Sequence, residues 1–212
     1  MKKETIGSVL MFLLVLVFVG SADADIREAL VFSNNTPGFA NSFSNYNIGF
    51  KFQTNEAISV QALGFYDYGQ DGLGESHGVA VYDSNGALLV QGTVSPSDSL
   101  DGLFHYTTDF LPINLDADKV YHLIGYANSS ADKVAGIFTG VTVDPAVSFG
   151  GNLSSWGGPL KFIDKGDGAG YDYGWFGPNM KIGAPIPEPI SGVFLLMGGA
   201  VLLRGKSRKN AV

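Results

Sequence analysis

Two acidic, glycine-rich segments of this sequence contain closely spaced carboxylates that could bind a metal ion. The first places the carboxylates of Asp67, Asp71 and Glu75 within nine residues. Calcium binds about six to eight oxygen ligands, and glycines let the backbone curl so that its carbonyl oxygens face inward. The segment therefore predicts calcium binding by Asp67, Asp71 and Glu75. Turn formation alone, which favours Asp and Gly, is the alternative explanation.

The second acidic segment contains Asp164, Asp167 and Asp172, again with glycines between them. The same argument predicts that these three carboxylates form another calcium site. Neither segment has the ligand spacing of an EF-hand loop. Both predictions therefore rest on the local density of carboxylates and glycines.

Catalytic motifs do not stand out in this chain. It has no cysteine, which excludes thiol nucleophiles and thiolate zinc sites. His77, His105 and His122 are its only histidines, and none lies at metal-binding spacing from another or beside a G-x-S-x-G nucleophile motif. We therefore expect a non-enzymatic protein, with a hydrolase of surface polymers as an alternative.

Aromatic residues suggest a different kind of ligand. The tetrapeptide Tyr-Asp-Tyr-Gly occurs at 66–69 and again at 171–174, and Trp156, Trp175 and Phe176 lie near the second copy. Aromatic rings beside Asp and Asn can stack on the apolar face of a sugar and accept its hydroxyl hydrogen bonds. A carbohydrate-binding module is therefore an alternative function. Burial of these rings in a β-sandwich core is the alternative explanation.

The segment 25–186 has the length of one domain and predicts an all-β fold. Ile48, Phe50 and Phe52 alternate with polar or small residues, the pattern of a strand with one buried face. The Asn85-Gly86 turn predicts a hairpin between 79–82 and 88–94, because both residues accept positive φ angles. We expect a single jelly-roll-like antiparallel β-sandwich. Its other predicted strands are 59–66, 103–110, 120–126, 133–139, 161–163 and 179–182.

The charge of the chain is unevenly distributed. Residues 25–189 contain 7 Lys and Arg and 18 Asp and Glu, a net charge of −11. Nucleic acids and anionic lipids need a basic surface, so neither is expected as a partner. Six of the 13 basic residues lie at the two extremities. Basic ends that remain cytoplasmic while the acidic body crosses the membrane agree with the positive-inside bias.

The N-terminus has the three parts of a signal peptide. Lys2 and Lys3 are followed by an apolar run at 9–19, and Ala22 and Ala24 occupy the small-residue positions of a cleavage site. We expect residues 1–24 to direct export through the Sec machinery and to be removed before Asp25.

The C-terminus combines a short polar motif, an apolar helix and a basic tail. Pro187-Glu188-Pro189 precedes the apolar run 190–203, which as a helix spans about 21 Å and is short for a bilayer. The two prolines prevent the helix from extending backwards. Basic side chains after the run can reach the headgroups, which predicts a weak and temporary membrane span. These basic residues are Arg204, Lys206, Arg208 and Lys209.

This order of elements closely resembles the PEP-CTERM sorting signal, so that residues 187–212 are similar to the tails of exosortase substrates. The resemblance implies processing by an exosortase-type membrane enzyme, with Pro187-Glu188-Pro189 as the sorting motif. It also implies transient residence in the inner membrane, and then a place at the cell surface or in a biofilm matrix with exopolysaccharide as a partner.

The body resembles a recurring exported module of unknown function. The resemblance begins at Gly64-Phe65-Tyr66-Asp67-Tyr68-Gly69 and continues through Ser76-His77 and the hairpin around Asn85-Gly86. Later elements are Leu103-Phe104-His105-Tyr106 and Phe176-Gly177-Pro178-Asn179. It covers about 50–180, implies a β-sandwich, and carries no catalytic residues to this sequence.

Overall fold

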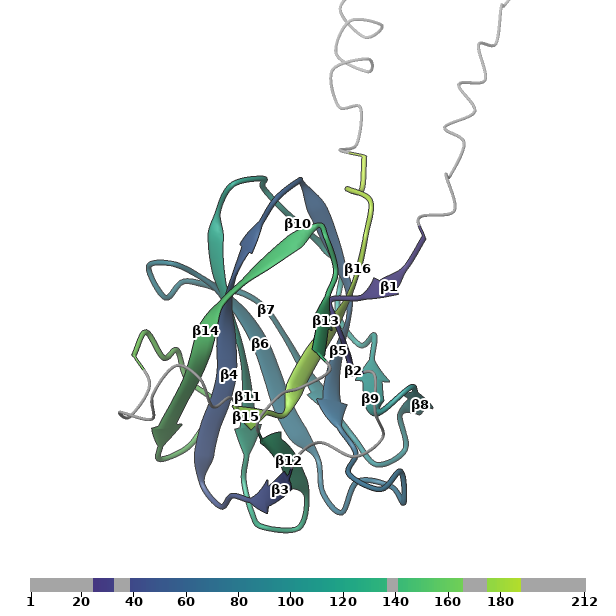
Figure 1. Ribbon diagram of the computed structural model, residues 1–212, viewed down its shortest axis with the longest axis vertical. Coiled ribbons are helices and arrows are strands. Elements are labelled where there is room, and N and C mark those ends of the chain that lie inside the picture. The colour runs from purple at the N-terminus through teal and green to yellow at the C-terminus, as the bar shows by residue number, and fades with distance from the viewer. Residues whose placement is uncertain (1–24, 33–38, 137–140, 166–174, 188–212) are drawn as a thin grey trace, which may run out of the picture.

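The computed structural model describes residues 25–32, 39–136, 141–165 and 175–187, and within them every paired strand is antiparallel (Figure 1). The described residues contain strands, turns and loops but no helix. The predicted all-β fold is therefore confirmed. The predicted helix at 190–203 lies outside the described residues.

Two large sheets make up most of the domain. The first has the strand order β1 (Arg27–Glu28), β16 (Pro178–Gly183), β5 (Ile58–Tyr66), β9 (Phe104–Thr107) and β8 (Ser99–Asp101), and β10 (Ile113–Leu115) also pairs with β5. The second has the order β14 (Val147–Trp156), β4 (Tyr46–Thr54), β11 (Val120–Ala127), β6 (His77–Asp83) and β7 (Leu88–Val94).

Two small sheets complete the described part of the fold. One contains β15 (Trp175–Phe176), β12 (Lys133–Gly136) and β3 (Phe39–Ser42), and the other pairs β13 (Val141–Val143) with β2 (Leu30–Phe32).

One hydrophobic cluster joins the two large sheets. Ile48, Phe50 and Phe52 project from β4 into it, as their alternation predicted. Phe65 of β5 contributes from the other sheet and stacks on the ring of His77 in β6, with 3.7 Å between ring centroids. Burial of apolar area at about 25 cal/mol per Å² is the main force that holds such sheets together. Further members are Val60, Leu63, Val79, Val81, Leu123, Met180 and Ile182.

The predicted hairpin is confirmed, with one difference in its turn. β6 pairs with β7, and Gly86 N donates to Asp83 O over 3.1 Å. Gly86 has a φ of +85°, but Asn85 is not among the described residues with positive φ. The backbone bond makes Ser84 and Asn85 the central residues of the turn, and Gly86 follows them in the left-handed conformation typical of a three-residue hairpin loop. The Asp83 carboxylate also accepts hydrogen bonds from the backbone of Asn85 and Ala87, each at 2.8 Å. These bonds lower the pKa of Asp83, the bond from Ala87 most strongly.

The predicted strand at 161–163 is wrong. These residues form a loop that crosses the outer face of the second sheet, where Phe162 packs edge-on against Tyr82. Lys161 N donates to the Asn47 side chain over 3.0 Å instead of to a neighbouring strand. The apolar side chains of this loop, Phe162 and Ile163, pack across the outer face of the sheet. Apolar residues in such a loop give the same local sequence pattern as a short strand.

The sequence pattern did not predict β14. This strand has 10 residues and pairs with β4 along its length. Its sequence includes Gly150-Gly151 and several polar residues, and a bulge lies between Phe149 and Gly151. Glycine and a bulge interrupt the period of two, so the alternation that marks a strand is lost.

Candidate functional site

The first acidic segment is the loop between β5 and β6, and its first carboxylate points into the protein. Asp67 is 2% exposed, and its Oδ2 lies 3.1 Å from Nε2 of His105. The same oxygen accepts a hydrogen bond from Gly72 N over 3.1 Å. Asp67 therefore fastens the start of the loop to β9.

The other two predicted calcium ligands lie apart from Asp67. Asp71 is exposed, whereas the Glu75 carboxylate accepts hydrogen bonds from Ser129 N at 2.7 Å and from Asn128 Nδ2 at 2.8 Å. Within the described residues, the group of acidic and histidine side chains close enough to share an ion does not include Asp67 or Asp71. The structure does not bring the three predicted ligands together.

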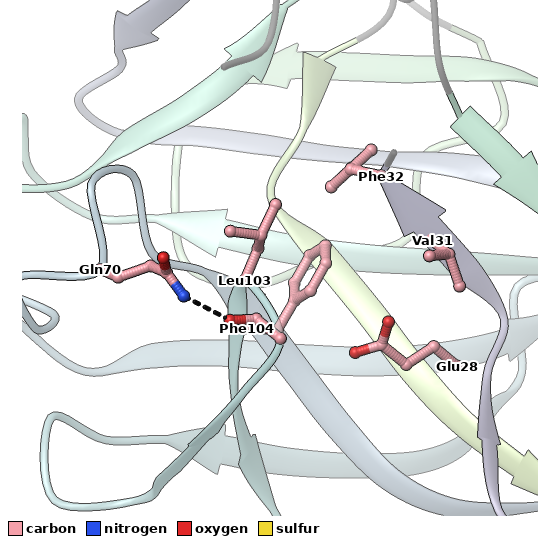
Figure 2. Close-up of a pocket in the computed structure, with 7 residues that line it drawn as sticks. Glu28, Val31, Phe32, Gln70, Leu103 and Phe104 are labelled. Atoms are coloured by element: carbon pink, nitrogen blue, oxygen red, sulfur yellow. Dashed lines mark hydrogen bonds between the residues drawn. The ribbon is translucent and has the colours of Figure 1, made fainter. Parts of the chain in front are cut away.

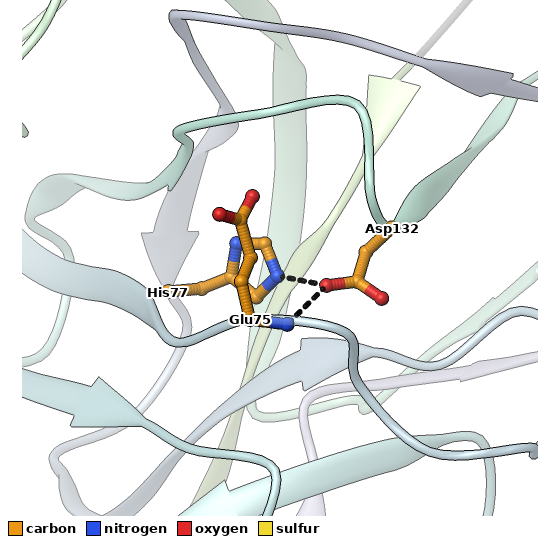
Figure 3. A group of neighbouring side chains, drawn as sticks. All are labelled: Glu75, His77 and Asp132. Carbon is orange, nitrogen blue, oxygen red and sulfur yellow. Dashed lines mark hydrogen bonds and ion pairs between the residues drawn. The ribbon is translucent and has the colours of Figure 1, made fainter.

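Glu75 is instead part of a three-residue cluster with His77 and Asp132 (Figure 3). One potential ligand atom from each side chain lies within 4.8 Å of the others. His77 Nε2 is 2.8 Å from Asp132 Oδ2, which also accepts a hydrogen bond from Glu75 N over 3.2 Å. Two segments that are 55 residues apart in the sequence, the start of β6 and the loop before β12, meet at this point.

The His77 ring has a fixed orientation. It is 1% exposed and lies nearly parallel to the Phe65 ring, with 6° between the planes. Its Nδ1 is 3.1 Å from the backbone oxygen of Tyr126. Because a carbonyl oxygen can only accept, Nδ1 carries the proton of that bond, and Nε2 faces the carboxylate of Asp132.

A second histidine–aspartate pair lies at the opposite end of the same loop. His105 Nδ1 is 2.6 Å from the backbone oxygen of Asp98, and Nε2 faces Asp67. Both partners are buried, with side chains 8% and 2% exposed. No further acidic or histidine side chain of the described part of the chain joins this pair as a third potential ligand.

The third histidine has no carboxylate at hydrogen-bond distance. His122 is buried on the outer face of the second sheet, and its Nε2 has no hydrogen-bond partner among the described residues. The nearest carboxylate oxygen, on Asp164, is 4.0 Å away. Burial lowers the pKa of His122, and the positive charge of Lys51 lowers it further.

Only one of the carboxylates in the second acidic segment is described. Asp164 is exposed and forms an ion pair with Lys51 at 3.0 Å, which lowers the pKa of Asp164. The other two predicted ligands, Asp167 and Asp172, lie outside the described residues. The prediction of a second calcium site therefore remains a prediction.

A small cavity of about 190 Å³ lies between β2 and the turn before β9 (Figure 2). Phe32 and Phe104 form apolar walls, and the Glu28 carboxylate faces the cavity. Burial raises the pKa of Glu28, although a hydrogen bond from the Tyr106 hydroxyl at 2.9 Å opposes that shift. Among the described residues that line this cavity, Glu28 supplies the one carboxylate.

A larger groove of about 770 Å³ crosses the outer face of the first sheet. Apolar side chains at its rim include Leu100, which is 42% exposed, and Ile26, which is 54% exposed. Its polar side chains include Gln61 and Lys181, and the Lys181 ammonium lies 4.5 Å from the centre of the Tyr106 ring.

The predicted sugar-stacking aromatics are divided between core and surface. Tyr66 is buried, and Trp175 and Phe176 pack with the main hydrophobic cluster. Tyr68 is 37% exposed with the Lys133 ammonium 4.9 Å from its ring centre, and Trp156 is 65% exposed. The 171–174 copy of the tetrapeptide lies outside the described residues. The buried members fit the alternative reading as core residues.

The sorting motif is described only at its first residue. Pro187 is exposed, whereas Glu188, Pro189 and the basic residues Arg204, Lys206, Arg208 and Lys209 lie outside the described residues, as does the signal peptide 1–24. Among the residues that the structure describes, none forms a helix of the length and apolarity needed to cross a membrane.

The sequence pattern did not predict two residues of the three-residue cluster. No second histidine lies at metal-binding spacing from His77, and Asp132 lies outside both acidic segments. One signal was present in Glu75-Ser76-His77, because residues two apart on an extended segment point to the same side. Nothing in the sequence indicated that Asp132 would join them.

Residues 34–154 match the family model described as a domain of unknown function, DUF4082. This span is more than half of the chain and includes both histidine–aspartate pairs. No curated protein matches the chain significantly.

Proposed function

The chain belongs to the DUF4082 family of domains of unknown function, and we propose that this member is an exported, non-enzymatic protein of the cell surface or extracellular matrix. An exosortase-type enzyme sorts it through the tail at 187–212. The body is a jelly-roll-like β-sandwich, a proposal that the two facing antiparallel sheets support.

The pairing of β1 with β16 carries this proposal. Arg27 is opposite Ile182, so the first and last described strands are neighbours in one sheet. The described chain therefore enters and leaves the domain at the same end (Figure 1). The described strands all lie between Arg27 and Gly183, so that removal of the two proposed processing segments takes no residue from the sheets.

The test is fractionation of the native host that produces wild-type or Glu188→Ala protein. We expect the variant to accumulate at full length in the inner membrane, while the wild type is processed and released. Glu56→Ala, which removes an exposed carboxylate of the body, is the matched control and should be processed normally. Equal processing of Glu188→Ala and wild type would overturn the proposed sorting mechanism.

Carbohydrate binding is a second candidate function, and the groove on the first sheet favours it. A sugar ring presents an apolar face and several hydroxyl groups, and this groove combines exposed Leu100 and Ile26 with polar Gln61 and Lys181. The net charge of −11 over residues 25–189 disfavours polyanions as the ligand, so we expect a neutral glycan.

A glycan array probed with the full-length chain in detergent tests this second function. Leu100→Asp should abolish binding to any neutral glycan that the wild type retains. Leu88→Asp is the matched control, because Leu88 is 52% exposed on β7 and does not line the groove. Retention of no glycan by the wild type, or equal loss in both variants, would argue against the groove as a sugar site.

A further inference from the structure

The cluster of Glu75, His77 and Asp132 has the composition of a metal site. Each side chain offers one ligand atom, and the three atoms lie within 4.8 Å of one another (Figure 3). The chain between β5 and β6 contributes Glu75, β6 contributes His77, and the loop before β12 contributes Asp132. The described residues contain no other such group.

Backbone and side-chain groups outside the cluster orient each of the three side chains. The Nδ1–H of His77 donates to Tyr126 O, which leaves Nε2 directed at the cluster. A metal-binding histidine in proteins typically donates its other ring N–H to a carbonyl or carboxylate in this way. Hydrogen bonds from Ser129 N and from Gly74 N hold the carboxylates of Glu75 and Asp132 respectively.

The free ring nitrogen of His77 faces the carboxylates of the cluster. Nε2 lies 2.8 Å from Asp132 Oδ2, and a Glu75 carboxylate oxygen lies within 4.8 Å of the other two ligand atoms. With Nδ1 engaged by Tyr126 O, Nε2 is the ring nitrogen available to a cation. One imidazole nitrogen and two carboxylate oxygens that converge in this way form a ligand set for a metal ion.

We propose that Glu75, His77 and Asp132 bind a divalent transition metal ion, for which zinc is the best match. Zinc accepts imidazole nitrogen at about 2.0–2.1 Å and carboxylate oxygen at about 2.0–2.2 Å, whereas calcium and magnesium take oxygen ligands. Three protein ligands leave a fourth tetrahedral position for water. This differs from the calcium set predicted from sequence, which shares only Glu75 with the cluster.

Zinc takes the lone pair of His77 Nε2, and its affinity rises with pH because metal ligands bind in their deprotonated forms. For tetrahedral angles, the separation of Nε2 and Oδ2 must widen from 2.8 Å to about 3.4 Å. The Asp132 side chain, which lies near the surface at 10% exposure, can make this movement. The ion then ties the loop before β12 to the start of β6.

Isothermal titration calorimetry on the full-length chain, freed of metal by chelator and held in detergent, tests the proposal. We expect zinc to bind with 1:1 stoichiometry and to release protons, seen as a dependence of the heat on the buffer. Calcium and magnesium should bind at least about 10-fold more weakly, because they prefer all-oxygen sites.

Variants locate the ion. Glu75→Gln and Asp132→Asn should each weaken zinc binding by about 10-fold or more, while Asp71→Asn, an exposed carboxylate of the same loop, should not change it. His77→Gln should also lose zinc, and the two carboxylate variants keep the test valid if His77→Gln does not fold. Circular dichroism establishes that each titrated variant retains its β-structure.

Two outcomes would overturn the proposal. The first is the absence of saturable zinc binding by the folded wild type, which would leave hydrogen bonding as the role of the three side chains. The second is an equal loss of zinc or calcium affinity in Asp71→Asn and in Glu75→Gln. That result would place the ion on the exposed loop. Neither outcome bears on sorting through the tail, which the fractionation experiment tests separately.

Discussion

The two ends of the loop between β5 and β6 are fastened by the same chemistry in different surroundings. At one end His105 faces Asp67, and at the other His77 faces Asp132. Each ring directs Nδ1 at a backbone oxygen and Nε2 at a carboxylate. The His105 pair is buried on both sides, whereas Asp132 lies near the surface with Glu75 beside it.

This difference separates a structural pair from a candidate ligand site. Among the described residues the His105 pair has no third acidic or histidine ligand, and its side chains are only 8% and 2% exposed, which fits a structural role. The His77 pair has a second carboxylate beside it, that of Glu75, and contact with solvent, which a metal ion needs in order to enter and complete its coordination. A histidine–aspartate contact alone therefore does not identify a site.

Removal of the buried carboxylate should have the largest effect on stability. Asp67→Ala leaves the Nε2 of His105 and the N–H of Gly72 without their acceptor in the interior. We expect the free energy of unfolding to fall by about 3–5 kcal/mol, as for other broken buried pairs. Urea denaturation followed by tryptophan fluorescence measures this change. A loss below about 1 kcal/mol would show that water or a rearranged loop replaces the pair.

The same change at the other end should cost less in metal-free protein. Asp132→Ala also removes acceptors from His77 and from the backbone of Gly74, but Asp132 lies where water can replace them. We expect a loss of about 1–3 kcal/mol by the same measurement. Zinc should raise the free energy of unfolding of wild type and of Asp67→Asn, but not that of Asp132→Ala. A larger loss of unfolding free energy in Asp132→Ala than in Asp67→Ala, both without metal, would reverse the comparison.

His122, which lacks a carboxylate at hydrogen-bond distance, should make stability depend on pH. Burial lowers its pKa below 6.5, so the folded state favours the neutral ring and the unfolded state binds the proton more readily. Its contribution is complete above pH 6.5 and is lost as the pH falls toward the folded pKa, by up to about 1.4 kcal/mol per unit.

His122→Phe should reduce this part of the pH dependence, because phenylalanine does not titrate. Urea denaturation of both proteins between pH 7 and pH 5 makes the comparison. Parallel stability profiles for wild type and variant would show that His122 does not contribute.

The smallest effect is expected at the middle of the loop. Asp71 is exposed, and within the described residues it belongs to no metal-binding group. Asp71→Asn should therefore leave the urea midpoint and the zinc affinity unchanged within error. If calcium clearly raises the melting temperature of wild type and Asp71→Asn abolishes that rise, the result would contradict this expectation and support the calcium site predicted from sequence.

Particular residues show how far the sequence alone could reach. The alternation around Phe50 and the Asn85-Gly86 turn predicted β4 and the β6–β7 hairpin, because strand and turn signals depend on neighbours in the chain. The run at 161–163 was misassigned because packing across the outer face of a sheet gives the same local pattern as a short strand. β14 was missed because a bulge and two glycines remove the alternation.

By itself the sequence determined the all-β class and the acidic body, and it carried the predictions of a signal peptide and a sorting tail. All of these depend on composition and on residues close together in the chain. The tertiary structure decided which carboxylates meet which histidines. Asp67 and Glu75 lie in one short segment but point to different partners, and Asp132 reaches His77 across 55 residues. Such contacts follow from strand pairing and sheet packing, which local spacing does not encode.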